Sequence, residues 1–280
     1  MFLRSPAKIN LFLKALGKRP NGFHNLESLF AFLDLSDELS VEKSDKFSLE
    51  ITGEFAEFVD PKNNLFIEIL DFFTTEFAIE KNLKIKIIKH IPVGAGLGGG
   101  SSNASAFMKI LNEIFALNLS KEELQKISLN FGSDIAFFFE TQASIIKGRG
   151  EIIENFYAFE PIPALLINPK IHLSTKEVFE KFDGNYSAEI PTKDLLKTEI
   201  FELIKSLAND LEKPAIAMVP TIGEILNQLR KNGADFAKMS GSGASCFGIF
   251  HDAEKLITAE KNLQKTFPDF FIKRVKILSR

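Results

Sequence analysis

The chain has 280 residues, and at the usual ~150 residues per domain this length favours two domains. Hydrophobic residues make up 45% and charged residues 25%, which is typical of a globular protein and excludes a disordered chain, a collagen-like repeat and a coiled-coil rod. The net charge of −3 provides no basic field for nucleic acid, and no apolar run approaches the ~20 residues of a membrane span.

Along the first half of the chain, strands and helices are both predicted. Alternating apolar and polar residues predict strands at 5–14, in two short runs within 39–51, and at 83–88, 143–147 and 151–153. Apolar residues at helical spacing predict helices at 64–77 and 101–115, and from a Ser-x-x-Glu capping box at 120–123 to about residue 130.

In the second half, a proline-containing stretch at residues 159–163 predicts a boundary between domains 1–160 and 161–280. Beyond it, strands are predicted at 164–168, 236–239, 245–250 and 270–278, and helices at 174–182, near 199–207, at 221–232 and from 252. Because strands and helices do not alternate regularly, the order favours an α+β fold over a doubly wound sheet.

A glycine-rich loop is the strongest signal in the chain. Five glycines in seven residues let backbone N–H groups turn inward, and a predicted helix follows directly, so the segment is typical of an anion-binding site. The predicted phosphate-binding residues are Pro92, Gly94, Gly96, Leu97, Gly98, Gly99, Gly100, Ser101 and Ser102.

Other glycine motifs fit this loop poorly. Gly94, Gly96 and Gly99 match G-x-G-x-x-G, but a dinucleotide site needs a second strand that ends in an acidic residue ~20 positions on, where a helix is predicted here. A Walker A loop would have lysine at Gly100, and a protein kinase would have H-R-D and D-F-G downstream. A nicotinamide-dependent oxidoreductase is therefore a remote alternative.

The loop resembles the P-x-G-x-G-L-G-S/G-S-S motif of the GHMP kinases. Further segments resemble one branch of that family, which acts on a cytidine-diphosphate-linked alcohol. They are S-P-A-K-I-N-L-F-L at 5–13, R-P-N-G-F-H at 19–24, G-S-D-I-A-F-F at 132–138, A-N-D-L-E at 208–212 and M-S-G-S-G-A at 239–244. The chain departs from the branch at Asn21, Phe23 and Ala136, where Asp, Tyr and Pro are usual. Phe23 keeps a stacking face but lacks the tyrosine hydroxyl.

The resemblance implies the two-domain GHMP kinase architecture, with an N-terminal domain similar to domain 2 of ribosomal protein S5 and a ferredoxin-like C-terminal domain. It implies ATP-dependent phosphorylation, with Mg²⁺, of the 2-hydroxyl of 4-diphosphocytidyl-2-C-methyl-D-erythritol in non-mevalonate isoprenoid synthesis. The alternatives are a homoserine- or mevalonate-type kinase of the same family and a nucleotide-binding protein without catalysis. We expect a monomer or weak dimer with no nucleic-acid or membrane partner.

By the same resemblance, Lys8 and Asp134 are the catalytic residues. Asp134 would accept or orient the substrate hydroxyl, and Lys8 would stabilise charge on the transferring phosphoryl group. From the residues alone, Lys8 could also be a solvated charge on a strand, and Asp134 could be a cap. Ser101 or Ser102 could bind Mg²⁺, or the phosphates and water could suffice.

The resemblance places Asn10 near the acceptor and assigns Phe23, His24 and Phe179 to the cytidine moiety. An aromatic face beside an imidazole suits a nucleobase, which offers a surface for stacking and a polar edge. A surface histidine is the alternative for His24. With 29 phenylalanines in the chain, Phe179 could equally belong to the core.

A second glycine turn, formed by Gly241, Ser242 and Gly243, lies between two predicted strands and would close on the phosphates, or be a plain turn. Cys246, the single cysteine, is expected to be a small buried apolar residue. It excludes an internal disulfide and suits a reducing compartment, so we expect a cytoplasmic protein.

Overall fold

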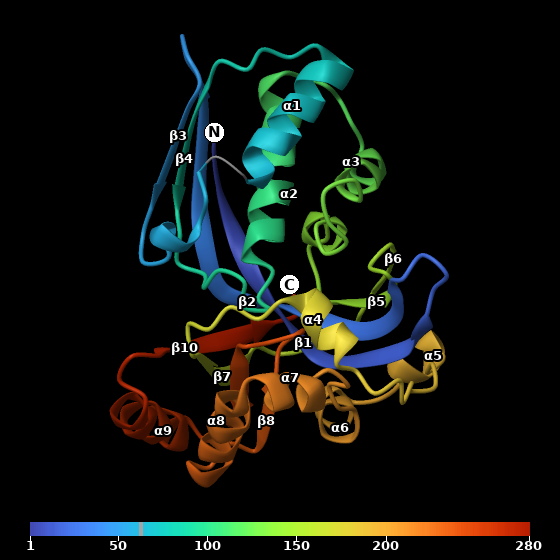
Figure 1. The fold of residues 1–280 in the computed structure, drawn as a ribbon, viewed down its shortest axis with the longest axis vertical. Helices are drawn as coiled ribbons and strands as arrows, with labels where there is room; N and C mark the ends of the chain where they lie inside the picture. Colours follow the sequence, from blue (N-terminus) through green and yellow to red (C-terminus); the bar gives the residue numbers. More distant parts are fainter. Residues whose placement is uncertain (62–63) are drawn as a thin grey trace. The chain divides into compact units, whose positions relative to one another are not determined.

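The computed structural model describes residues 1–61 and 64–280, which divide into two compact units that interleave along the sequence (Figure 1). Unit 1 comprises Met1–Ala7, Leu35–Val93 and Gly98–Thr141. Unit 2 comprises Lys8–Asp34, Gly94–Leu97 and Gln142–Arg280. This is a different division from the predicted domains 1–160 and 161–280, whose boundary remains a prediction.

Two long strands, β1 (Phe2–Lys18) and β2 (His24–Lys43), contribute residues to both units. The other strands are β3 (Ser48–Thr52), β4 (Leu83–Ile88), β5 (Ser144–Gly148), β6 (Ile152–Asn155), β7 (Ile162–Asn168), β8 (Phe236–Met239), β9 (Cys246–Ile249) and β10 (Phe271–Leu278). The alternation of apolar residues predicted most of these strands, but it missed residues 24–38 of β2. Residues 27–33 of this part are all buried, and within them residues 29–33 are apolar without alternation.

In unit 1, the end of β2 pairs antiparallel with β4, and β3 pairs parallel with β4. In unit 2, the start of β2 pairs with β5, which pairs with β6. β10 pairs with β2 and β7, and β9 lies between β7 and β8, with all of these pairs antiparallel.

Helices cover the sheets of both units. They are α1 (Leu65–Phe77), α2 (Gly99–Ile114), α3 (Lys121–Ser128), α4 (Thr175–Glu180), α5 (Thr192–Leu195), α6 (Ile200–Ser206), α7 (Glu212–Met218), α8 (Pro220–Lys231) and α9 (Ala253–Thr266). Two short 3-10 helices are η1 (Ala56–Phe58) and η2 (Ala136–Phe139). The sequence patterns missed α5 and α7. Four residues are too few for α5 to show a period, and α7 starts without a side-chain cap and contains Pro214.

Side-chain caps fix several helix starts where the sequence predicted them. Ser120 and Glu123 form the predicted capping box of α3. Asn64 caps α1 by accepting a hydrogen bond from the backbone N–H of Phe66, and Asp252 caps α9 in the same manner. These local hydrogen bonds explain why the predicted and observed helix starts agree within one or two residues.

The core of unit 1 lies between its helices and strands, where α1 and α2 run side by side (Figure 1). The rings of Phe66 in α1 and Phe107 in α2 meet edge to face, with 5.1 Å between centroids. Other phenylalanines of unit 1, among them Phe72, Phe73 and Phe131, also pack ring against ring in or beside this core. The burial of large aromatic side chains is a main contribution to the stability of such a core.

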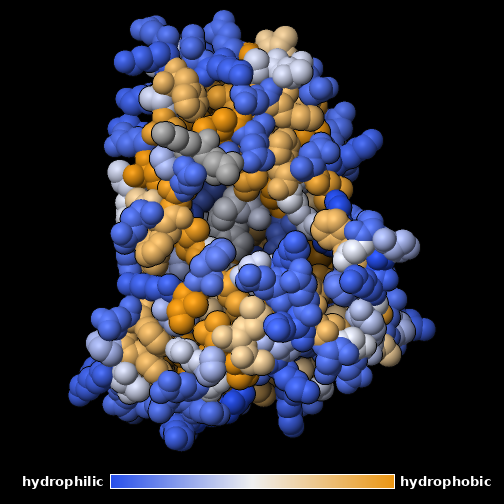
Figure 2. All heavy atoms as spheres, viewed as in Figure 1, coloured by the Kyte–Doolittle hydropathy of each residue, from blue (hydrophilic) through white to orange (hydrophobic). Residues whose placement is uncertain are grey.

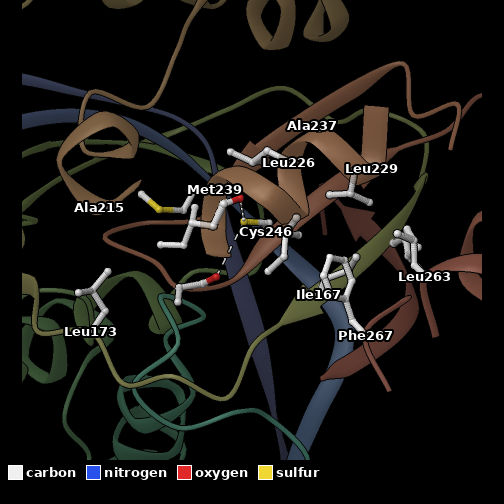
Figure 3. Packing of buried hydrophobic residues seen from close by; sticks show 14 of the residues in the cluster. Ile167, Leu173, Ala215, Leu226, Leu229, Ala237, Met239, Cys246, Leu263 and Phe267 are labelled. Carbon is white, nitrogen blue, oxygen red and sulfur yellow. Dashed lines mark hydrogen bonds between the residues drawn. The ribbon is translucent and has the colours of Figure 1, made fainter. Parts of the chain in front are cut away.

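The core of unit 2 is formed by α8 and α9 packed on β7, β8, β9 and β10. Figure 3 shows Met239, Cys246, Leu226 and Ile167 lying close together in this core. Cys246 is fully buried, as predicted, and burial raises the pKa of its thiol well above the usual value.

On the visible face, hydrophilic side chains surround smaller hydrophobic patches (Figure 2). Within the described ranges, no helix has the length and apolar character needed to cross a membrane.

Candidate active site

The glycine loop leaves β4 and ends in α2. Gly94, Gly96 and Gly98 all have φ between +62° and +74°, the left-handed region that glycine adopts without a steric penalty. Gly98 is also the N-cap of the 16-residue helix α2, and it supplies no side-chain cap. The first N–H groups of α2 are therefore left for another acceptor, and the helix dipole favours an anion there.

Steric crowding explains why two of these positions must be glycine. A Cβ at Gly96 would lie 2.3 Å from the backbone oxygen of Ser240, and a Cβ at Gly94 would lie 2.3 Å from Nδ1 of His172. At Gly100 a Cβ would meet no atom within 4 Å. The tight part of the loop is thus its first half, whereas position 100 has room for a side chain.

The second glycine turn lies directly against this loop, within unit 2. The hydroxyl of Ser240 donates to the backbone oxygen of Gly96 at 3.0 Å. The backbone N–H of Ser245 donates to the oxygen of Ala95 at 3.3 Å. The structure therefore brings together the predicted phosphate-closing turn and the first half of the predicted phosphate loop.

Asn209 holds that turn in place, a role that the sequence reasoning missed. Its amide donates to the backbone oxygens of Met239 at 3.0 Å and Gly241 at 2.8 Å, and the side chain is 5% exposed. The A-N-D-L-E segment was recognised as a motif, but its sequence alone does not reveal which backbone the amide reaches.

Lys8 and Asn10 lie side by side on β1, and both are buried, at 3% and 1% exposure. The ammonium of Lys8 donates to Oδ1 of Asn10 at 2.7 Å and lies 4.4 Å from the ring centroid of Phe30. Its backbone N–H donates to Leu97 in the glycine loop at 2.9 Å. The alternative interpretation of Lys8 as a solvated charge is therefore wrong.

Asn10 connects this lysine to the second glycine turn. Its backbone N–H donates to the hydroxyl of Ser240 at 3.3 Å, and its side-chain amide donates to the hydroxyl of Ser28 at 2.9 Å. One buried network thus joins Lys8, Asn10 and Ser240 to Gly96. Satisfied buried networks of this kind hold their members rigidly.

Asp134 belongs to unit 1 and is half-buried, in the segment between α3 and η2. Ile135, and not Asp134, occupies the cap position of η2. Because Lys8 belongs to unit 2, the predicted pairing of these two residues stays a prediction.

The residues predicted to bind cytidine make two separate contacts within unit 2, one at His24 and one at Phe23. His24 stacks on Phe179 with 4.5 Å between ring centroids and an interplanar angle of 13°, and Tyr186 lies 6.1 Å from the same imidazole. Phe23 is 52% exposed and faces the guanidinium of Arg149 at 5.1 Å. The sequence reasoning did not include Tyr186 or Arg149, because neither lies in a recognised motif.

The surroundings of His24 favour the neutral form of its imidazole. Burial lowers the pKa of its imidazole below the ordinary 6.5, and the charge of Lys18 lowers this pKa further. A neutral imidazole offers one donor and one acceptor, which is the combination needed to read a base edge.

Ser101 and Ser102 are the third and fourth residues of α2. Ser101 is half-buried. Ser102 is 1% exposed, and its hydroxyl oxygen has no hydrogen-bond partner among the described residues. Within the part of the chain that the structure describes, no cluster of three His, Cys, Asp or Glu side chains could hold a metal. The start of α2, with Ser101 and Ser102, would therefore suit Mg²⁺ only if the phosphates and water supplied most of the ligands, which is common for this ion.

Comparison with known proteins identifies the family. The GHMP kinase N-terminal domain profile matches residues 64–141, and the GHMP kinase C-terminal profile matches residues 193–269. The chain is 35% identical over 273 residues to 4-diphosphocytidyl-2-C-methyl-D-erythritol kinase of Chelativorans sp. (strain BNC1), covering 96% of this chain and 93% of that protein. The chain belongs to the GHMP kinases, and the expected two-domain α+β architecture is confirmed.

Within this family, the similarity points to one particular enzyme. The kinase of the same name from Bacteroides thetaiotaomicron is 38% identical, covering 87% of this chain and 90% of that protein. A crystal structure of 4-(cytidine 5'-diphospho)-2C-methyl-D-erythritol kinase matches with a TM-score of 0.79 and 26% identity, covering 98% of this chain and 99% of the other.

More distant neighbours share the fold alone. A homoserine kinase from Cytophaga hutchinsonii matches with a TM-score of 0.73 but only 16% identity, covering 100% of this chain and 95% of the other. The nicotinamide-dependent oxidoreductase is excluded as an alternative, because the glycine loop is that of a kinase family.

Proposed function

We propose that this chain is an ATP-dependent kinase that phosphorylates the 2-hydroxyl of 4-diphosphocytidyl-2-C-methyl-D-erythritol. The products are the 2-phosphate and ADP, and the step belongs to non-mevalonate isoprenoid precursor synthesis. The observation that carries this proposal is the 35% identity to a kinase of that name across 96% of the chain. A homoserine- or mevalonate-type activity has weaker support, because those neighbours share 15–16% identity.

The glycine loop and the first turn of α2 would bind the triphosphate of ATP. The left-handed conformation at Gly94, Gly96 and Gly98 and the uncapped start of α2 support this role. The free hydroxyl of Ser102 fits Mg²⁺, and Ser101 is a second candidate ligand. When bound, the ion would neutralise charge on the phosphate oxygens.

Lys8 and Asp134 would act on the transferring group. The acceptor oxygen forms a bond to the γ-phosphorus, the bond from that phosphorus to the bridging oxygen of ADP breaks, and the hydroxyl proton moves to the carboxylate of Asp134. Lys8 would stabilise the negative charge that spreads over the phosphoryl oxygens. Its bond to Asn10 supports the role, because it fixes the ammonium before substrate arrives.

The cytidine moiety would bind near His24. Phe179 and Phe23 offer aromatic faces, and the neutral imidazole offers a donor and an acceptor for the cytosine edge. Asn10 would lie near the erythritol end of the acceptor, as the resemblance implies.

One assay tests the function directly. Purified protein is incubated with ATP, Mg²⁺ and 4-diphosphocytidyl-2-C-methyl-D-erythritol, and ADP release is followed together with formation of the 2-phosphate. Homoserine and mevalonate serve as matched acceptors. Equal or faster turnover of either one, or ADP release without phosphorylated product, would overturn the proposal.

A further inference from the structure

A buried carboxylate lies beside the glycine loop in unit 1, and it has no role in the chemistry proposed above. Asp37, near the end of β2, is 0% exposed. Its Oδ1 accepts hydrogen bonds from the backbone N–H groups of His90 at 2.7 Å and Ile91 at 2.9 Å. Its Oδ2 accepts from Asn103 at 3.0 Å and from the ammonium of Lys89. Four donors thus converge on one carboxylate.

These donors come from the two ends of the glycine loop. Lys89, His90 and Ile91 directly precede Pro92, where the loop begins. Asn103 follows Ser102, where the loop has become α2. The side chain of Asp37, on β2, therefore joins the segment that leads from β4 into the loop to the helix α2 that follows the loop.

The partner lysine lies under the start of the helix. Lys89 is 3% exposed, and its Nζ lies 3.6 Å from the point where Gly99 would carry a Cβ. A buried ammonium alone would be costly, and the carboxylate of Asp37 compensates its charge. Among the residues that the structure describes, the neighbouring Ser102 hydroxyl has no hydrogen-bond partner.

We propose that Asp37 is a positioning residue for nucleotide binding, which acts through Asn103 and residues 89–91. It fixes the distance between the two ends of the loop, so that the N–H groups already converge before the triphosphate arrives. Preorganisation of this kind raises affinity because the loop loses less conformational freedom on binding. The inference rests on the proposed function only in taking the loop as the ATP site.

The sharpest test removes the hydrogen bond from Asn103 to Asp37 and keeps the ion pair between Lys89 and Asp37. Asn103→Leu preserves the approximate shape of the side chain but deletes the donor to Asp37. The Kd of a non-hydrolysable ATP analogue, measured by calorimetry, should rise about 10- to 150-fold, the equivalent of losing one charge-assisted hydrogen bond. The KM for ATP should rise in parallel, while the KM for the cytidine-linked acceptor stays unchanged. Asn103→Ala provides the same test if the leucine variant folds poorly.

Asn112→Ala is the matched control. Asn112 lies in the same helix and makes two hydrogen bonds with the backbone of Leu119, at 2.9 and 3.0 Å, away from the loop. This variant should lower Tm and leave the nucleotide Kd unchanged. The inference is overturned if the Asn103 variants bind the analogue like the wild type, or if Asn112→Ala weakens binding equally. Absence of turnover in a wild-type protein that binds the analogue would instead count against the proposed function alone.

Discussion

The imidazole of His24 lies flat against the ring of Phe179, with 4.5 Å between centroids and 13° between planes. The two residues are 155 positions apart, on β2 and α4, and only His24 lies in a recognised motif segment. Phe179 is also packed against the core of unit 2, so its ring has both a place at the edge of that core and a specific partner at the proposed cytidine site.

Phe179→Ala should therefore impair binding of the acceptor. Loss of an aromatic stacking surface costs about 1–3 kcal/mol, so the acceptor KM should rise about 5- to 150-fold while the ATP KM changes little. Phe201→Ala is a matched control, since Phe201 lies 4.7 Å from the ring of another histidine, His251. Steady-state kinetics with each substrate varied would check this. An increase confined to the ATP KM would contradict the assignment of Phe179 to the cytidine site.

The pH dependence of acceptor binding should follow His24. Burial and Lys18 lower the folded-state pKa of His24 below 6.5, so the neutral imidazole is favoured in the fold. As the pH falls, the imidazole of His24 takes up a proton in the unfolded chain before it does so in the folded protein. The contribution of His24 to the free energy of unfolding is therefore present above pH 6.5, and it is lost as the pH falls through the folded-state pKa. The acceptor KM should likewise rise only below pH 6.5. An NMR titration of His24 that gave a pKa above 6.5 would contradict this prediction.

Gly96→Ala should weaken ATP binding at least tenfold, and Gly100→Ala should not. The first change places a methyl group 2.3 Å from the oxygen of Ser240 at a φ of +74°, whereas the second places it in open space within α2. Alanine at Gly100 should even raise Tm slightly, since glycine in a helix costs roughly 0.5–1 kcal/mol relative to alanine. Calorimetry with an ATP analogue would measure both, and equal affinities would exclude the first half of the loop as a phosphate site.

Asp134→Asn should lower kcat by roughly 10²–10⁴, the usual contribution of a positioned base. Lys8→Ala should cost a comparable factor, because charge on the phosphoryl group is left uncompensated. Since both residues would act on one transition state, the double variant should lose much less than the product of the single losses. Strictly multiplicative losses, with substrate binding intact, would show that the two side chains act independently.

The sequence by itself determined the local features of this protein. Helix starts at Asn64, Ser120 and Asp252 were predictable because each cap is a hydrogen bond to a backbone two or three residues away. The glycine loop was predictable for a similar reason, since its φ angles and the following helix depend on adjacent residues. The motif segments also pointed to the family that the comparisons confirmed.

Only the tertiary structure decided how distant segments meet. The bonds of Asn10 to Ser240, Asn103 to Asp37 and Asn209 to Gly241 join residues 230, 66 and 32 positions apart. Residues 24–38 of β2 escaped prediction, and over residues 27–33 burial on both faces removes the alternation that marks a strand. A polar side chain carries no signal of its partner along the chain. Its partner is chosen when folding removes both groups from water and each must find a hydrogen bond.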